Sequence, residues 1–127
     1  MEKYLEEITK PFSAGQPRKE ALSRLLGLLD LTTLDGTDNP ERVNALCNKA
    51  LSFSAKGLPS PAAVCVYPPF AALVSAKLSG SGIFTASVAG AFPSGQLPVH
   101  LKVAEAEYAV AHGADEIDMV ISRGTFL

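Results

Sequence analysis

The fold is decided in residues 26–51, LGLLDLTTLDGTDNPERVNALCNKAL, where a short apolar run leads through a turn into a periodic segment. The run at 26–34 is typical of a buried strand, and the turn DGTDN follows it. Pro40 then opens a segment whose apolar residues recur with helical spacing: Val43, Leu46, Cys47, Ala50 and Leu51. Asp38 or Asn39 is the candidate N-cap of that helix. The stretch therefore predicts a strand followed by a helix.

The same strand and helix unit recurs along the chain. AAVCVY at 62–67 predicts a second strand, and Pro69 starts a helix with one apolar face: Phe70, Leu73, Val74 and Leu78. IFTASVA at 83–89 predicts a third strand. After the loop GAFPSGQ, a helix is expected from about Pro98 to His112 with one apolar side: Val99, Val103, Ala106 and Val110. EIDMVI at 116–121 predicts a fourth strand, so the alternation indicates an α/β protein with a parallel sheet.

Side-chain alternation sorts the polar positions of the four expected strands. The polar or small residues that share a face within their own strands are Asp30 with Thr32, Cys65, Thr85 with Ser87, and Asp118. Apolar residues occupy the opposite face of each strand. This asymmetry favours a barrel with an active interior over a doubly wound open sheet. Since strands this apolar are covered on both faces, Asp118 is expected to be buried and to need a partner or a function.

Composition limits the classes of function. The chain has 127 residues, 47% of them hydrophobic and 19% charged, as in one modest globular domain. With 11 basic and 13 acidic residues the net charge is −2, so no nucleic-acid partner is expected. The uncharged runs are interrupted by proline and glycine, and we expect no membrane partner. Two cysteines, Cys47 and Cys65, are too few for a disulfide framework, and no apolar targeting segment opens the sequence, so a cytoplasmic protein is expected.

We expect two parts in the chain. Residues 1–26 form an N-terminal helical extension with pieces at Glu2 to Lys10 and Pro17 to Leu26, and residues 27–127 hold the strand and helix units. The latter part resembles a known family through four segments in order: LDLTTLDG, AAVCVYPPF, ASVAGAFPSGQ and GADEIDMVISRG. From about Leu28 to Phe126 the chain closely resembles the first half of deoxyribose-phosphate aldolase, a class I aldolase family.

The resemblance implies a fold and a reaction. The fold is a (β/α)8 TIM barrel, of which this chain holds about four of the eight parallel strands. The reaction is the reversible cleavage of 2-deoxy-D-ribose 5-phosphate to glyceraldehyde 3-phosphate and acetaldehyde. In this family a strand lysine forms a Schiff base with the substrate, so no metal and no organic cofactor is implied. The implied partner is a small phosphorylated sugar or aldehyde.

The family's site residues match four positions of the chain. Asp118 matches the aspartate that serves the proton relay beside the Schiff base. Asp30 and Thr32 match residues that line the site, and Cys65 matches a cysteine near the substrate aldehyde. Without the resemblance, Asp118 could be part of a structural ion pair, Asp30 a device that ends a strand, and Cys65 a small buried hydrophobe. The loop FPSGQ either borders the substrate or is a plain turn.

The chain also departs from the family. A TIM barrel typically takes about 250 residues, and the family's Schiff-base lysine, a second active-site lysine and most phosphate-binding loops belong to later strands. The lysines of this chain fall outside the expected strands, at positions read as extension, loop or helix surface: Lys3, Lys10, Lys19, Lys49, Lys56, Lys77 and Lys102. Because a Schiff base needs an amine of lowered pKa, we predict that the 127-residue chain does not run the aldolase reaction alone.

Two hypotheses remain from the sequence. In the first, the chain is the N-terminal half of a full aldolase, a fragment produced by truncation, proteolysis or an early stop. In the second, it is a non-catalytic half-barrel that acts by assembly, since open strand edges pair with available strands. Both hypotheses expect association, with further copies of the chain or with the missing half. Both also expect a fragile isolated monomer.

Overall fold

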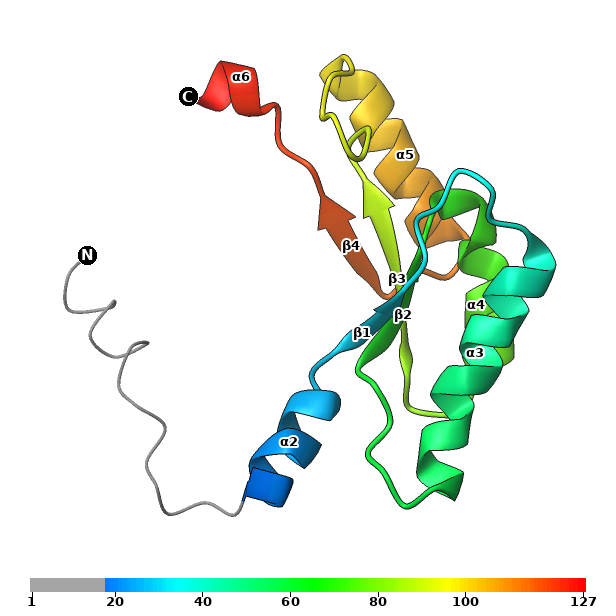
Figure 1. The fold of residues 1–127 in the computed structure, drawn as a ribbon. Coiled ribbons are helices and arrows are strands. Elements are labelled where there is room, and N and C mark those ends of the chain that lie inside the picture. The colour runs from blue at the N-terminus through cyan, green and yellow to red at the C-terminus, as the bar shows by residue number, and fades with distance from the viewer. Residues whose placement is uncertain (1–17) are drawn as a thin grey trace, which may run out of the picture.

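The computed structural model describes residues 18–127 (Figure 1). Its elements follow in the order α2 (Arg18–Leu26), β1 (Asp30–Thr32), α3 (Pro40–Ala55), β2 (Ala63–Val66), η1 (Pro68–Phe70), α4 (Ala71–Leu78), β3 (Phe84–Ala89), α5 (Val99–Ala111), β4 (Glu116–Met119) and α6 (Arg123–Phe126). The helix expected at Glu2 to Lys10 lies outside the described residues. The first strand is shorter than the apolar run that predicted it. No helix in the described part of the chain is long and apolar enough to cross a membrane.

The four strands form one parallel sheet in the order β1-β2-β3-β4. Neighbours in sequence are therefore neighbours in the sheet, and each pair is connected through a helix. The helices α3, α4 and α5 lie on one side of this sheet (Figure 1). The expected α/β class with parallel strands is confirmed.

Helix α3 forms as its sequence predicts. Asn39 is the N-cap, its side chain accepts a hydrogen bond from the Arg42 backbone N–H, and Pro40 occupies the first turn. Its buried stripe meets α4 and the sheet in the main core cluster, which consists of Val43, Cys47, Ala50, Val64, Val66, Val74, Leu78 and Ile83. This core fixes the sheet against its helices, so the opposite face of the sheet is the one that no described helix covers; it is called the open face below.

The apolar side expected to anchor helix α5 is exposed instead. Val99, Val103 and Val110 are 72%, 48% and 57% exposed, whereas Lys102 and Ala109 are buried. Ala109 belongs to a small cluster of alanines that lets α5 approach the sheet closely. These three valines are largely exposed, which the helical spacing alone could not show. The assignment of Lys102 to the helix surface was likewise wrong.

The polar face of the third strand was expected on the interior side of the sheet, and this expectation was also wrong. Thr85 pairs with Val64 and Ser87 with Val66, so the two hydroxyl side chains face the helices, and both are buried. Ala86 takes the opposite face, beside Cys65. The buried hydroxyl of Ser87 is satisfied there because it donates a hydrogen bond to the carbonyl oxygen of Val88.

Candidate functional site

The open face of the sheet brings the predicted site residues together. Thr32 pairs with Cys65 in the register of β1 and β2, and Asp30 lies two residues earlier on the same face. Asp118 pairs with Val88 of β3, on the face that also carries Cys65. The structure therefore places all four on one face of the sheet, although they come from three different strands.

Cys65 and Asp118 are in direct contact across β3. The thiol of Cys65 donates a hydrogen bond to Oδ2 of Asp118 over 3.4 Å. Cys65 is 2% exposed and lies in a small apolar cluster: Ala63, Ala86 and Val88, with Leu34, Tyr67 and Phe92 packed against it. The thiol thus holds one carboxylate oxygen while the rest of the Asp118 side chain stays open to a ligand.

The environment keeps the Cys65 thiol protonated. The pKa of Cys65 is raised to about 12, mainly by burial and in addition by the hydrogen bond to Asp118 and the negative charges of Asp118, Asp30 and Glu116. A thiol with so high a pKa is a weak nucleophile at neutral pH. In this site Cys65 is therefore a hydrogen-bond donor.

The expectation that Asp118 is buried is corrected by the structure. Asp118 is exposed, as are Asp30 and Thr32. The strands β1 and β4 are the outer strands of the sheet, and no described element covers the face that carries these residues. The cost of burying a charge consequently does not apply, and these side chains are accessible to solvent and ligands.

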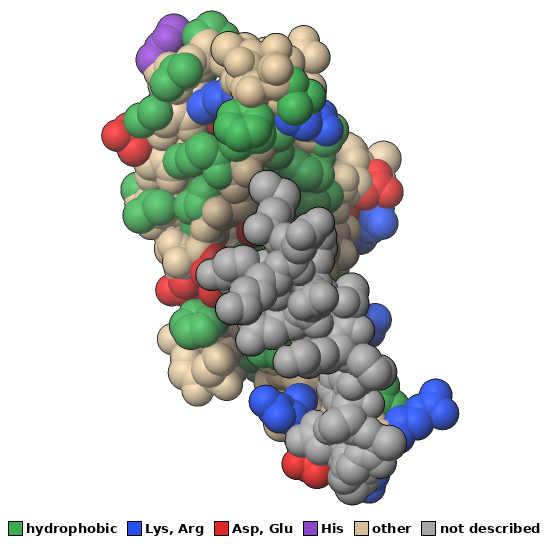
Figure 2. All heavy atoms as spheres, turned by 90° about the vertical axis from the view of Figure 1, so that its left-hand side faces the viewer, with side chains coloured by type: hydrophobic (Ala, Val, Ile, Leu, Met, Phe, Trp, Pro, Cys, Tyr) green, Lys and Arg blue, Asp and Glu red, His purple; other side chains and the backbone are tan. Residues whose placement is uncertain are grey.

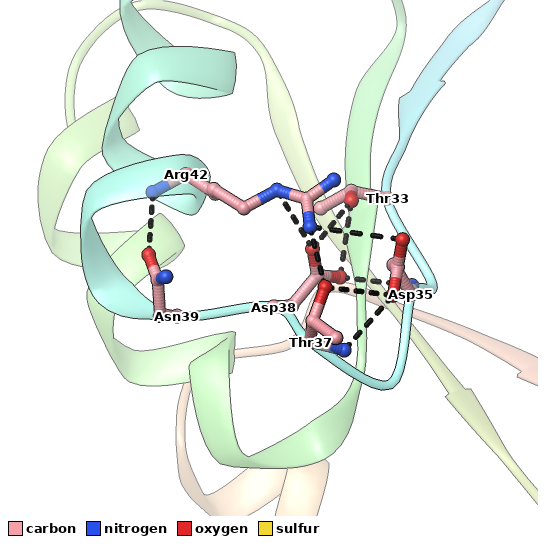
Figure 3. A network of polar contacts seen from close by, with 6 residues as sticks. All are labelled: Thr33, Asp35, Thr37, Asp38, Asn39 and Arg42. Carbon is pink, nitrogen blue, oxygen red and sulfur yellow. Dashed lines mark hydrogen bonds and ion pairs between the residues drawn. The ribbon is translucent and has the colours of Figure 1, made fainter.

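A polar network orders the loop that follows the carboxyl end of β1 (Figure 3). Thr33 donates to the carboxylate of Asp38 over 2.8 Å, and Arg42 forms ion pairs with Asp35 at 3.6 Å and Asp38 at 3.7 Å. Hydrogen bonds from Thr37 are the main cause that lowers the pKa of Asp35. The sequence indicated Asp38 only as a possible helix cap. The spacing of Asp35 and Thr37, which is typical of a turn, was the sequence signal from which this network could have been predicted.

The loop after β3 is anchored by residues that the sequence did not single out. The backbone N–H of Ala91 donates to the Glu105 carboxylate over 2.8 Å. Lys102 donates to the hydroxyl of Ser122 over 2.7 Å, and Ser122 donates to the carbonyl oxygen of Gly95. These side chains come from α5 and from the segment after β4, so only the fold brings them to the loop.

Residues 18–127 bring no three His, Cys, Asp or Glu side chains together as a group that could hold a metal ion. The His112 ring stacks on Tyr108 at 3.9 Å between centroids, with Nδ1 2.7 Å from the carbonyl oxygen of Tyr108. The described geometry thus offers a hydrogen-bonded carboxylate on an open sheet face as its main chemical group.

The fold and this geometry can be compared with known proteins. No model of a protein family matches the chain. A relative from Caenorhabditis elegans is 41% identical over 118 residues, and the deoxyribose-phosphate aldolase of Homo sapiens is 39% identical over 119 residues. The chain is homologous to part of deoxyribose-phosphate aldolase. It spans 37% of the length of each of these two relatives, which align with 86% and 84% of it.

The structural comparison agrees with this homology. The tetrameric deoxyribose-phosphate aldolase of Aeropyrum pernix superposes with a TM-score of 0.68 at 27% identity, covering 81% of this chain and 41% of that one. The four parallel strands and their helices therefore correspond to part of an aldolase TIM barrel.

Proposed function

We propose that the open sheet face supplies part of the active site of a class I deoxyribose-phosphate aldolase, which cleaves 2-deoxy-D-ribose 5-phosphate reversibly. The contact between Cys65 and Asp118 carries the proposal, because it presents an oriented carboxylate on the open face of a sheet that corresponds to part of an aldolase TIM barrel. The two free, buried cysteines fit a reducing cytoplasm.

Each residue has a distinct role in this proposal. Asp118 moves protons at the substrate carbon beside the Schiff base, and Cys65 holds its Oδ2 in place. Asp30 and Thr32 line the same face from β1 and bind the substrate's polar groups. No metal or organic cofactor takes part.

The amine for the Schiff base must come from outside the described strands, because none of them contains a lysine. The buried lysine Lys102 lies on α5 and donates to Ser122. It therefore lies on a helix, outside the strands that carry the proposed site residues. We infer that the 127-residue chain alone does not form the Schiff base.

Reduction with borohydride, which traps a Schiff base between the protein and its substrate, tests this proposal. The 13.3 kDa chain, incubated with deoxyribose 5-phosphate and borohydride, is expected to show no added mass. A chimera in which residues 28–126 replace the aligned part of the human aldolase is expected to be trapped. Asp118→Asn in that chimera should slow cleavage about a hundredfold or more, because general acid–base catalysis contributes about that much.

The controls separate failure of folding from failure of chemistry. Circular dichroism must show that the chimera and its Asp118→Asn variant are folded. An adduct on the isolated chain would overturn the inference that it is catalytically incomplete. A folded chimera that cleaves equally fast with and without Asp118 would contradict the role of that carboxylate.

One observation favours a second function, that of a non-catalytic half-barrel that acts by self-assembly. Apolar side chains are exposed on α5, at the end of β4 and just after it, including Val103, Val110, Met119 and Ile121. Hydrophobic side chains gather in the upper half of the face seen in Figure 2. Because β1 and β4 are the outer strands, two copies could pair these edges and cover the exposed residues.

Light scattering coupled to size exclusion tests assembly. If the chain self-assembles, its mass is expected to be a multiple of 13.3 kDa, and Val103→Glu with Val110→Glu should lower it. The matched control, Lys49→Glu on exposed α3 surface, should leave the mass unchanged. A monodisperse monomer that unfolds cooperatively would exclude this second function.

A further inference from the structure

A polar cavity of about 510 Å³ lies where the loop after β3 meets the segment after β4. Its lining includes Ser94, Gly95, Ser122, Arg123, Gly124 and Thr125. The described lining contains hydroxyl groups and a guanidinium but no carboxylate. Ligands of parallel α/β folds bind beyond the carboxyl ends of the strands, which is where this cavity lies.

A buried positive charge stands directly behind the cavity. Lys102 is 7% exposed, and its Nζ donates to the hydroxyl of Ser122, which lines the cavity, over 2.7 Å. In the described residues every ion pair involves Arg42, so Lys102 has no carboxylate partner there. A lysine ammonium has three donors, and a buried ammonium is stabilised by an anion.

A second cation lies at the rim of the cavity. Arg123 is exposed, and its Nη2 donates to the carbonyl oxygen of Pro93 over 3.2 Å. This hydrogen bond links the side chain to the loop after β3. The guanidinium has five N–H donors in all, so further donors remain for a ligand.

The cavity wall is held in one arrangement. The Ser122 hydroxyl donates to the carbonyl oxygen of Gly95 over 3.3 Å, which links the two segments that line the cavity. Gly95 has a φ of +72°, and its backbone packs directly on the carbonyl of Ile121. Because these contacts fix the cavity wall before a ligand arrives, little ordering of the wall is required on binding.

From these contacts we propose that the cavity binds a phosphate-type oxyanion, either free phosphate or the phosphate group of a small monoester. Arg123 provides N–H donors and positive charge at the cavity, and the ammonium of Lys102, hydrogen-bonded to the lining residue Ser122, provides a second positive charge behind it. A cation would find no carboxylate in the described lining. The volume leaves room for a small organic group beside the phosphate. Asp30, Thr32, Cys65 and Asp118 do not line this cavity, so the site is additional to the proposed catalytic face.

The test is an NMR titration of the whole chain at constant ionic strength. Inorganic phosphate and glycerol phosphate are added separately, and the amide signals of Gly95, Gly124 and Thr125 are followed. Saturable shifts at these amides are expected. Arg123→Gln should weaken binding about tenfold, since a hydrogen bond between charged groups is worth at least about that factor.

Matched variants decide the outcome. Arg24→Gln removes an exposed arginine from α2 and should leave the affinity unchanged. Lys102→Met should weaken binding in a folded protein; if it unfolds the chain, Arg123→Gln still tests the site. Tighter binding of glycerol phosphate identifies a monoester site, and equal binding identifies phosphate itself. The absence of saturable shifts, or an equal loss in Arg24→Gln, would overturn the proposal.

Discussion

Gly95→Ala is expected to lower the free energy of unfolding by about 3 kcal/mol, which combines two costs. Gly95 has a φ of +72°, in the left-handed region that disfavours a side chain. An added Cβ would also collide with the carbonyl oxygen of Ile121 and lie 3.0 Å from Cγ1 of Val120. Because the colliding atom is backbone, the strand end would have to shift.

Urea unfolding followed by circular dichroism measures this loss. The matched control is Gly36→Ala, because no atom lies within 4 Å of the Cβ added there. The control should change the free energy of unfolding by no more than about 1 kcal/mol. Equal midpoints for the two variants would contradict the close packing of Gly95 on the segment after β4. A loss of phosphate binding in Gly95→Ala would be expected from the same shift.

Local sequence signals predicted most of the fold. The cap and stripe of α3 lie within one segment, so Asn39, Pro40 and the buried Val43 could be inferred together. The apolar runs located all four strands, and their alternation with helices implied parallel pairing. The division of the chain at residue 26 stays a prediction.

The faces of β3 and α5 could not be inferred in this way. Alternation shows that Thr85 and Ser87 share a face, but only the pairing with Val64 and Val66 shows which face that is. Helical spacing likewise identifies a stripe with Val103, but not which side of α5 meets the sheet. Both depend on contacts between segments that are distant in sequence.

The candidate site was predictable in part. Alternation and the family resemblance pointed to Cys65 and Asp118, and the structure places them in contact. Their catalytic roles stay a prediction. The link from Lys102 to Ser122 spans 20 residues and joins a helix to a loop, so no local pattern could reveal it.

Cys65 is expected to react with a thiol reagent at pH 7.5 about a thousandfold more slowly in the native chain than in the unfolded chain. The native pKa of about 12 exceeds the ordinary value of 9.0 by about three units, and the thiolate fraction falls accordingly. Cys47→Ala leaves Cys65 as the single thiol for the assay. Adding Asp118→Asn should speed the reaction, because it removes a negative charge that raises the pKa.

The same pKa shift predicts a loss of stability at high pH. Since the thiol pKa is raised in the folded state, its stabilising contribution is fully present below about pH 9 and is lost as the pH rises towards 12. Three pKa units correspond to at most about 4 kcal/mol. Stability measured between pH 8 and 11 should therefore fall more steeply for the parent chain than for Cys65→Ala. If the stability of the two proteins falls equally with pH, and the thiol reagent also labels Cys65 rapidly in the native chain, then Cys65 is not the protonated donor that holds Asp118.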